Sequence, residues 1–334
     1  MTAYAYPLLI KHLLVTPIAH ASRCEIVYRD RMRYGYRTLK QRIGRLGSAL
    51  TSLGVEPGDT VAVMDWDSHR YLEAFFAIPM LGAVLQTVNV RLSPEQIIYT
   101  INHAGPSILL VNDEFTGLVE SIRPQLTKVK TLVVMSDRPS PATGNLDFAG
   151  EYEGLLAAAP PDYDFPDFDE NTLATTFYTT GTTGAPKGVY FSHRQLVLHA
   201  LAELAFLGIA GQQGRFSRDD VYMPITPMFH VHAWGFPWAA TLAGVKQVYP
   251  GRYEPAGSEL LVIRVVDNYD PGRAEPAGRN HHLGRAVTRH RRPRQGRLAR
   301  CGYASREWSS KTAISCYSTR TPTPAGRGAC PVAR

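Results

Sequence analysis

Apolar positions in the first 135 residues alternate between a helical spacing and short apolar runs. Leucine and isoleucine recur at steps of three and four from Leu39 to Leu53, and Gly54 follows as a stop signal for a helix. Tyr71–Leu81 predicts a second helix that is apolar over much of its surface, and a capping box that begins at Ser93 predicts a third. Buried strands are predicted at Val61–Met64, Val84–Val88, Ser107–Val111 and Leu132–Met135. This alternation predicts an α/β fold in which helices flank a parallel-rich sheet.

The alternation stops at residues 136–170, which are rich in Pro, Asp and Gly and show little periodicity. We interpret them as a linker, and we interpret its acidic run from Asp162 to Glu170 as solvated. Beyond the linker, Ser192 predicts the cap of a long leucine-rich helix. The remaining predicted strands are Leu173–Tyr178, Val189–Phe191, Val221–Met223 and Val245–Tyr249, and Trp234–Leu242 is a further apolar segment.

The loop between the first two of these later strands is suited to binding a polyphosphate. Residues 178–188 contain four threonines, three glycines and Lys187. Glycines allow positive φ angles and a close approach of N–H donors to an anion, while the hydroxyls add donors and the lysine adds charge. The loop is not a Walker A loop because Gly188, rather than Ser or Thr, follows the lysine. We favour ATP phosphates over a flexible surface turn, with these residues as ligands: Thr179, Thr180, Gly181, Thr182, Thr183, Gly184 and Lys187.

Composition places the chain among ordinary globular proteins, with 44% hydrophobic and 19% charged residues. No apolar run approaches the length of a membrane span. The apolar N-terminus from Tyr4 to Ala21 is similar to a signal peptide, but Lys11 and His12 interrupt it and no basic residue precedes it, so we interpret it as mature protein. Four cysteines without regular spacing argue against a disulfide framework and a zinc site, and we expect a reducing, cytoplasmic location.

The last quarter of the chain has a different character. Residues 1–250 contain 20 Lys and Arg against 23 Asp and Glu, whereas residues 251–334 contain 16 against 6. A nucleic-acid-binding arm would need interleaved aromatic residues, which are scarce there, and a plain disordered tail is a second interpretation. We favour a third, translation in a shifted reading frame, because Arg, Pro, Gly, Ala and Cys are enriched together. We therefore expect a domain at 1–256, an unstructured basic tail at 257–334 and no nucleic-acid partner.

The threonine loop resembles the signature loop of the AMP-binding, adenylate-forming enzymes. Three further segments, at residues 64–71, 87–93 and 227–235, are similar to the medium- and long-chain fatty-acid CoA ligases of that family. The resemblance extends from about Pro7 to about Pro255. It implies that the chain is an incomplete large N-terminal domain of an adenylate-forming enzyme.

The resemblance implies a two-step ligase whose small-molecule substrates are a fatty acid, ATP with Mg²⁺, and CoA. In the family the threonine loop holds the β- and γ-phosphates while the carboxylate attacks the α-phosphate. The family's segment beside the acyl pocket matches here, which assigns His230, Phe229 and Trp234 to that pocket. The alternative is that the aromatic residues belong to the core and that the histidine satisfies a local hydrogen bond. We interpret His193 and His232 as structural.

Several family motifs are missing from the 334 residues. There is no Tyr-Gly-x-Thr-Glu segment for nucleotide and Mg²⁺, no Tyr-Arg-Thr-Gly-Asp segment for ribose, and no lid domain with its lysine. Adenine, ribose and Mg²⁺ would therefore be poorly held, so we predict a truncated, inactive chain and assign neither a catalytic residue nor a metal ligand. Two functions stay open: a fatty acid–CoA ligase family member, and a non-catalytic nucleotide- or acyl-binding protein on the same scaffold.

Overall fold

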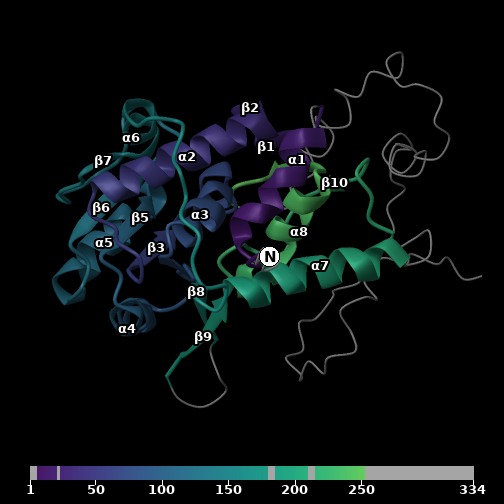
Figure 1. The fold of residues 1–334 in the computed structure, drawn as a ribbon. Helices are drawn as coiled ribbons and strands as arrows, with labels where there is room; N and C mark the ends of the chain where they lie inside the picture. The colour runs from purple at the N-terminus through teal and green to yellow at the C-terminus, as the bar shows by residue number, and fades with distance from the viewer. Residues whose placement is uncertain (1–5, 21–22, 180–184, 210–214, 253–334) are drawn as a thin grey trace, which may run out of the picture. The chain divides into compact units, whose positions relative to one another are not determined.

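A computed structural model describes residues 6–20, 23–179, 185–209 and 215–252 (Figure 1). The chain divides into two compact units, Met1–Ala277 and Gly278–Arg334, and every described residue lies in the first. The expected tail at 257–334 lies outside the described residues, so its boundary at 256 stays a prediction.

The larger sheet supplies the framework of the described unit. Its strands are β3 (Thr60–Met64), β4 (Val84–Thr87), β5 (Ile108–Asn112), β6 (Thr131–Met135), β7 (Gly150–Glu151), β8 (Leu173–Thr179) and β9 (Lys187–Ser192). They are ordered β7-β6-β5-β3-β4-β8-β9, and all neighbours are parallel except the antiparallel pair β8 and β9. The carboxyl ends of β3, β4 and β8 therefore meet at one edge, where ligands bind in open parallel sheets.

Helices cover both faces of this sheet because its strand residues alternate between two apolar cores. One core contains Val61, Val63, Leu110 and Val133 and packs against α2 (Tyr36–Ser52), α3 (His69–Met80) and α6 (Tyr152–Ala158). The other contains Ala62, Met64, Leu109 and Val111 and packs against α4 (Pro94–Ala104) and α5 (Thr116–Ile122). The predicted parallel-rich sheet with flanking helices is confirmed.

A smaller sheet in the order β10-β11-β1-β2 joins segments from both ends of the described chain. Its strands are β1 (Glu25–Tyr28), β2 (Met32–Gly35), β10 (Val221–Tyr222) and β11 (Lys246–Tyr249). Further helices of the described unit are η1 (Ile10–Leu14), α1 (Val15–His20), α7 (His193–Ile209), η4 (Val231–Gly235) and α8 (Phe236–Ala243). The Tyr36 hydroxyl donates to the carbonyl of Val245 over 2.6 Å, so α2 is fixed directly to this part of the fold.

The predicted linker at 136–170 needs correction, because β7 and α6 lie inside it. Tyr152 and Leu156, one helical turn apart, are both buried, and the Glu151 side chain caps α6 by accepting the Gly154 N–H. Two apolar anchors are enough for a helix of seven residues, but they are too few to produce a visible period among Pro, Asp and Gly. The acidic run also contains a buried residue, Phe165, although most of its carboxylates are exposed.

A buried carboxylate connects the two sheets. Glu73 on α3 is fully buried and accepts hydrogen bonds from the Tyr34 hydroxyl at 2.5 Å and the Tyr152 hydroxyl at 2.6 Å. It also pairs with Arg42 on α2, whose Nε lies 2.6 Å from a carboxylate oxygen. The same guanidinium reaches Glu153 at 2.8 Å. Strand β2, α2, α3 and α6 therefore meet at one satisfied ion pair.

We predict that Glu73→Gln lowers the free energy of unfolding by about 1–3 kcal/mol, because it removes the buried negative charge shared by Arg42 and two tyrosine hydroxyls and leaves Arg42 paired with Glu153 alone. Urea denaturation measures this change. The matched control is Glu25→Gln, which breaks the more exposed pair with Arg33, 3.0 Å apart, and should cost less than about 1 kcal/mol. Equal losses in the two variants would contradict the importance of the buried pair.

Candidate nucleotide and acyl site

The predicted phosphate loop is the connection of a β-hairpin. Thr179 ends β8, Lys187 begins β9, and the two residues are direct partners in the antiparallel ladder. Both side chains are exposed at the carboxyl edge of β8. Residues 180–184 lie outside the described part of the chain, so of the seven predicted ligands the structure places Thr179 and Lys187. The ladder brings these two together although seven residues separate them.

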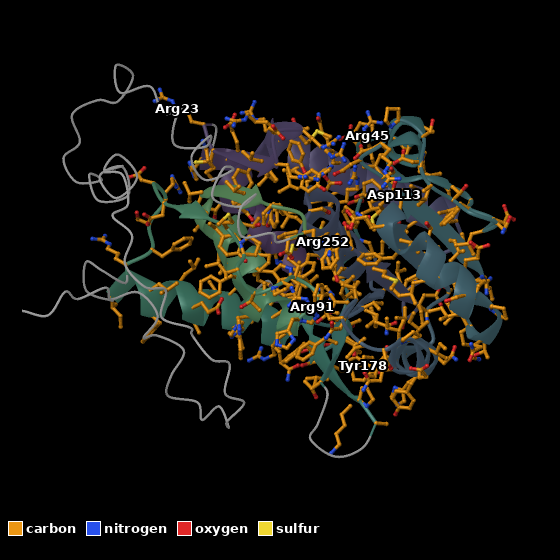
Figure 2. All side chains as sticks on the ribbon, turned by 180° about the vertical axis from the view of Figure 1, so that it is seen from behind. Arg23, Arg45, Arg91, Asp113, Tyr178 and Arg252 are labelled. Carbon is orange, nitrogen blue, oxygen red and sulfur yellow. The ribbon has the colours of Figure 1, made fainter. Side chains whose placement is uncertain are left out.

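The base of the hairpin is held to the rest of the fold by Tyr178, labelled in Figure 2. Its hydroxyl lies 2.8 Å from Nδ1 of His103 on α4, and the two rings meet edge to face with centroids 5.7 Å apart. The hairpin therefore projects from a fixed base.

The predicted acyl segment, residues 227–235, lies at the same carboxyl edge. Phe229 is buried, and its carbonyl accepts a hydrogen bond from Thr87 Oγ1 at 3.3 Å, at the end of β4. His230 is exposed, and Trp234 is 55% exposed to solvent. The three predicted acyl residues therefore differ: Phe229 belongs to the core, whereas His230 and Trp234 face outward.

Two arginines lie over aromatic rings beside this segment (Figure 2). The Arg91 guanidinium is 5.8 Å from the Phe229 ring centroid, and that of Arg252 is 5.5 Å from the Trp66 ring. Trp66 and Phe229 have centroids 6.2 Å apart, so the two cations flank one aromatic pair. Arg252 also lies 3.9 Å from Glu114. Positive charge at the edge favours anionic ligands.

His232 connects the hairpin to the acyl segment. Its ring is buried between Phe177 of β8, at 4.9 Å, and Trp238 of α8, at 5.6 Å. Phe75 and Phe191 complete the surrounding cluster. Burial lowers the pKa of His232 to about 3, opposed by a hydrogen bond to the Thr176 backbone, so the imidazole is neutral at physiological pH. The aromatic cluster around His232 is therefore shared by both predicted segments.

The other histidine interpreted as structural, His193, is also buried. Its Nδ1 accepts the Ile10 N–H at 3.2 Å, and burial lowers its pKa to about 4. The helix cap predicted at Ser192 is confirmed, because its hydroxyl accepts the Gln195 N–H at 3.3 Å at the start of α7.

Two buried carboxylates at the end of β3 were missed by the sequence analysis. Asp65 accepts hydrogen bonds from Ser68 at 2.5 Å and Asn112 at 2.7 Å, whereas Asp67 accepts the Met228 N–H at 2.6 Å. Burial raises the pKa of Asp65 to about 6 and that of Asp67 to about 7. Two acidic residues directly after an apolar strand were the available signal, but Asn112 and Met228 lie 47 and 161 positions away in the sequence from the carboxylates that they contact.

Comparison with known protein families decides which scaffold these elements form. The sequence model described as AMP-binding enzyme matches residues 18–272, more than half of the chain. The chain belongs to the AMP-binding enzyme family. This confirms the family predicted from the threonine loop.

Members of the family with curated functions include close relatives of the chain. It is 38% identical over 267 residues to the 3-methylmercaptopropionyl-CoA ligase of Ruegeria lacuscaerulensis, covering 79% of this chain and 48% of the relative. It is 46% identical over 228 residues to a long-chain-fatty-acid–CoA ligase of Thermus thermophilus, covering 67% and 39%. A solved anthranilate CoA ligase in complex with anthranoyl-AMP superposes with a TM-score of 0.66 at 25% identity, covering 79% and 50%. The chain thus spans half or less of the length of these relatives.

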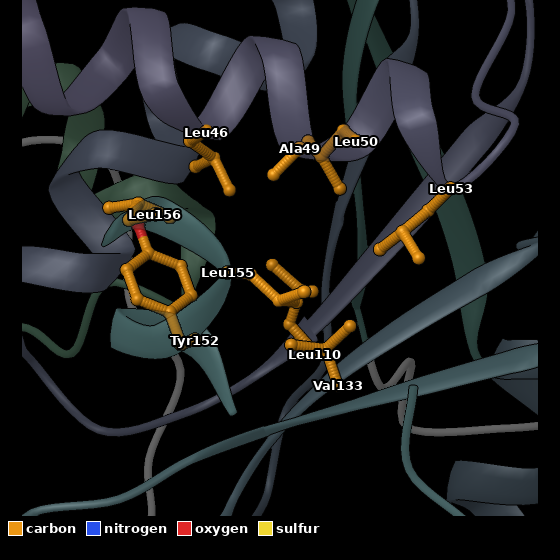
Figure 3. Close-up of a pocket in the computed structure, with 9 residues that line it drawn as sticks. All are labelled: Leu46, Ala49, Leu50, Leu53, Leu110, Val133, Tyr152, Leu155 and Leu156. Atoms are coloured by element: carbon orange, nitrogen blue, oxygen red, sulfur yellow. The ribbon is translucent and has the colours of Figure 1, made fainter. Parts of the chain in front are cut away.

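A small apolar cavity of this family member lies between α2, α6 and the larger sheet (Figure 3). Its volume of about 10 Å³ is close to the space that one water molecule requires. None of the predicted site residues lines it, so it is a packing gap. The lining residues are Leu46, Ala49, Leu50, Leu53, Leu110, Val133, Tyr152, Leu155 and Leu156.

We predict that His232→Asn reduces the fall in the free energy of unfolding between pH 7 and pH 5. A neutral buried histidine stabilises the fold fully above its unfolded pKa of 6.5, and this contribution is lost as pH falls toward about 3. Wild type should therefore lose about 2 kcal/mol through this group between pH 7 and pH 5, and the variant should not. Asparagine is chosen because it tolerates the positive φ of this position. Urea titrations at the two pH values measure the difference.

The control for this prediction is His199→Asn. His199 lies 3.2 Å from Glu203, and a hydrogen bond to Glu203 raises the pKa of His199 to about 9. The contribution of His199 to folding stability is therefore complete below about pH 6.5 and is lost as pH rises through about 9. This control should change the alkaline slope and keep the acid slope. An acid slope in His232→Asn equal to that of wild type would contradict the assignment.

Proposed function

We propose that the chain carries the nucleotide- and acyl-binding half of an ATP-dependent acyl-CoA ligase that acts on a medium- or long-chain fatty acid. The observation that supports this most is the shared aromatic cluster, because it joins the threonine-loop hairpin to the acyl segment through His232. The relatives support the class of reaction, since they are CoA ligases. The solved neighbour was captured with anthranoyl-AMP.

The proposed reaction has two steps. A carboxylate oxygen of the acid attacks the α-phosphorus of ATP, the bond to the bridging oxygen breaks, and pyrophosphate leaves. The CoA sulfur then attacks the acyl carbon, AMP leaves with the shared electron pair, and the thiol proton is released. Negative charge grows on the outer phosphates in the first step, so N–H, hydroxyl and ammonium donors around Thr179 and Lys187 would stabilise that transition state.

The acid would enter at the carboxyl edge of β4 and β8. There His230 is exposed, Trp234 offers a large apolar surface, and Arg91 supplies positive charge. Phe229 would support the pocket from below, because it is buried.

Magnesium would reach the site with ATP. Within the described ranges, no three His, Cys, Asp or Glu side chains are arranged to hold a metal ion. In nucleotide sites Mg²⁺ is held by one or two carboxylates together with substrate phosphates and water, so the ion would bind largely through ATP.

Location is a smaller part of the proposal. No helix in the described part of the chain is long and apolar enough to cross a membrane. Cys24, the cysteine within the described ranges, is a free thiol. A reducing cytoplasm is the compartment that we propose.

The second candidate is a non-catalytic nucleotide- or acyl-binding protein, favoured by the missing Tyr-Gly-x-Thr-Glu segment. Translating the encoding DNA past codon 256 in its other two frames separates the candidates. If that segment appears, the basic tail is a shifted frame, and the repaired chain should exchange pyrophosphate into ATP only when a fatty acid is present. If neither frame gives a sequence similar to the family, the result favours the non-catalytic binding protein over the ligase.

We predict that the 334-residue chain binds ATP but gives no acid-dependent pyrophosphate exchange, because the groups that position the α-phosphate are missing. Calorimetry with ATP and an exchange assay across a panel of C6 to C18 acids measure the two properties. Exchange above background would contradict the predicted inactivity, and a chain that is folded but does not bind ATP would contradict the proposed function.

We predict that Lys187→Ala weakens ATP binding by about 10–100-fold, the loss expected for a hydrogen bond to a charged partner. The matched control is Lys130→Ala, which removes an exposed lysine directly before β6, at the amino end of the parallel strands. Titration calorimetry compares the two variants. If both bind ATP as wild type does, the loop is not the phosphate site.

A further inference from the structure

The acyl segment contains a left-handed turn made mostly of residues that disfavour one. The φ angles of Val231, His232, Ala233 and Trp234 are 50°, 53°, 48° and 58°, and Gly235 follows at 79°. Each L-residue is disfavoured in this region, and a β-branched valine is a clear outlier. Such a backbone persists where its surroundings hold it.

The start of the segment is held by a buried carboxylate. Asp67, only 4% exposed, accepts the Met228 N–H at 2.6 Å through Oδ1. Its backbone carbonyl accepts the Gly251 N–H at 2.7 Å, so the residue is anchored from the other side as well. Because both groups are buried, breaking this bond would leave the Met228 amide unsatisfied away from water.

The end of the segment is held by α7. His199 Nε2 lies 2.9 Å from the Trp234 carbonyl, and the same ring contacts Glu203. A Cβ on Gly235 would lie 2.5 Å from the His199 ring, so this close approach depends on glycine. The left-handed turn is thus fixed at both ends, with His232 inserted into the aromatic cluster between them.

We propose that Asp67 is a positioning residue for acyl binding, because its hold on Met228 fixes the turn that presents His230 and Trp234 at the carboxyl edge. The proposal rests on the function proposed above. The neighbouring carboxylate Asp65 offers a natural contrast. Its side-chain partners, Trp66, Ser68 and Asn112, lie within the loop after β3 and at the end of β5, and none belongs to the acyl segment.

The first arm of the test is hydrogen exchange, followed by mass spectrometry on peptides that cover residues 224–236. Asp67→Leu replaces the carboxylate acceptor by an apolar side chain of similar size, and it should speed exchange of residues 224–236 by about 10–100-fold. Asp67→Asn keeps a neutral acceptor and should give a smaller rise, below about tenfold. Asp65→Asn should leave these peptides unchanged and speed exchange in β5 instead.

Two exchange results would overturn the proposal: wild-type rates in Asp67→Leu, or equal acceleration of residues 224–236 by the Asp65 and Asp67 variants. If Asp67→Leu does not fold, Asp67→Asn decides alone. A rise confined to 224–236 then supports the proposal, and wild-type rates overturn it.

The second arm measures ligand affinity with the fluorescent fatty acid cis-parinaric acid and, separately, with ATP. Asp67→Asn should weaken binding of the acid by about tenfold and leave ATP affinity unchanged, whereas a merely structural residue would weaken both. A parallel loss for both ligands contradicts positioning. If wild type binds no parinaric acid, the acyl part of the proposed function fails, and the exchange arm still decides whether Asp67 holds the turn.

Discussion

The burial of His232 among aromatic rings is the contact on which the rest of the site depends. Its ring lies against Phe177 on β8 and Trp238 on α8, so one side chain ties the hairpin of the larger sheet to the segment that precedes α8. The imidazole must be neutral to remain there, because charge is costly in an apolar environment. Opening this cluster would separate the two segments on which the proposed function rests.

Around this contact, the carboxyl edge of the larger sheet gathers groups of complementary chemistry. Thr179 and Lys187 stand at the mouth of the hairpin, and two arginines flank the aromatic pair of Trp66 and Phe229. Burial raises the pKa of Asp67, and the Met228 N–H and the nearby Arg91 charge oppose that rise, so the carboxylate lies below the surface and within reach of one of these arginines. Positive groups thus face solvent while the carboxylate shapes the backbone, an arrangement suited to anionic substrates.

Much of the fold followed from the sequence because its signals are local. The leucine steps of α2 and the Ser93 capping box at α4 predicted helices that are confirmed. The short helix α6 was missed, since two apolar anchors give no period. At the site, the loop between two strands was predictable from its composition. The left-handed turn was not predictable, because most of its residues disfavour positive φ angles. The Asp67–Met228 contact was not predictable either, because it joins residues 161 positions apart. No periodic pattern encodes such a contact.

Hydrogen exchange of residues 179–187 in the presence of ATP reports directly on whether the hairpin loop holds the outer phosphates. If the loop surrounds the outer phosphates, its amides should become protected in a saturable manner with ATP, and AMP, which lacks those phosphates, should protect them much less. ATP that binds without slowing exchange in this stretch, or equal protection by AMP, would contradict the central claim that the hairpin loop is the phosphate site.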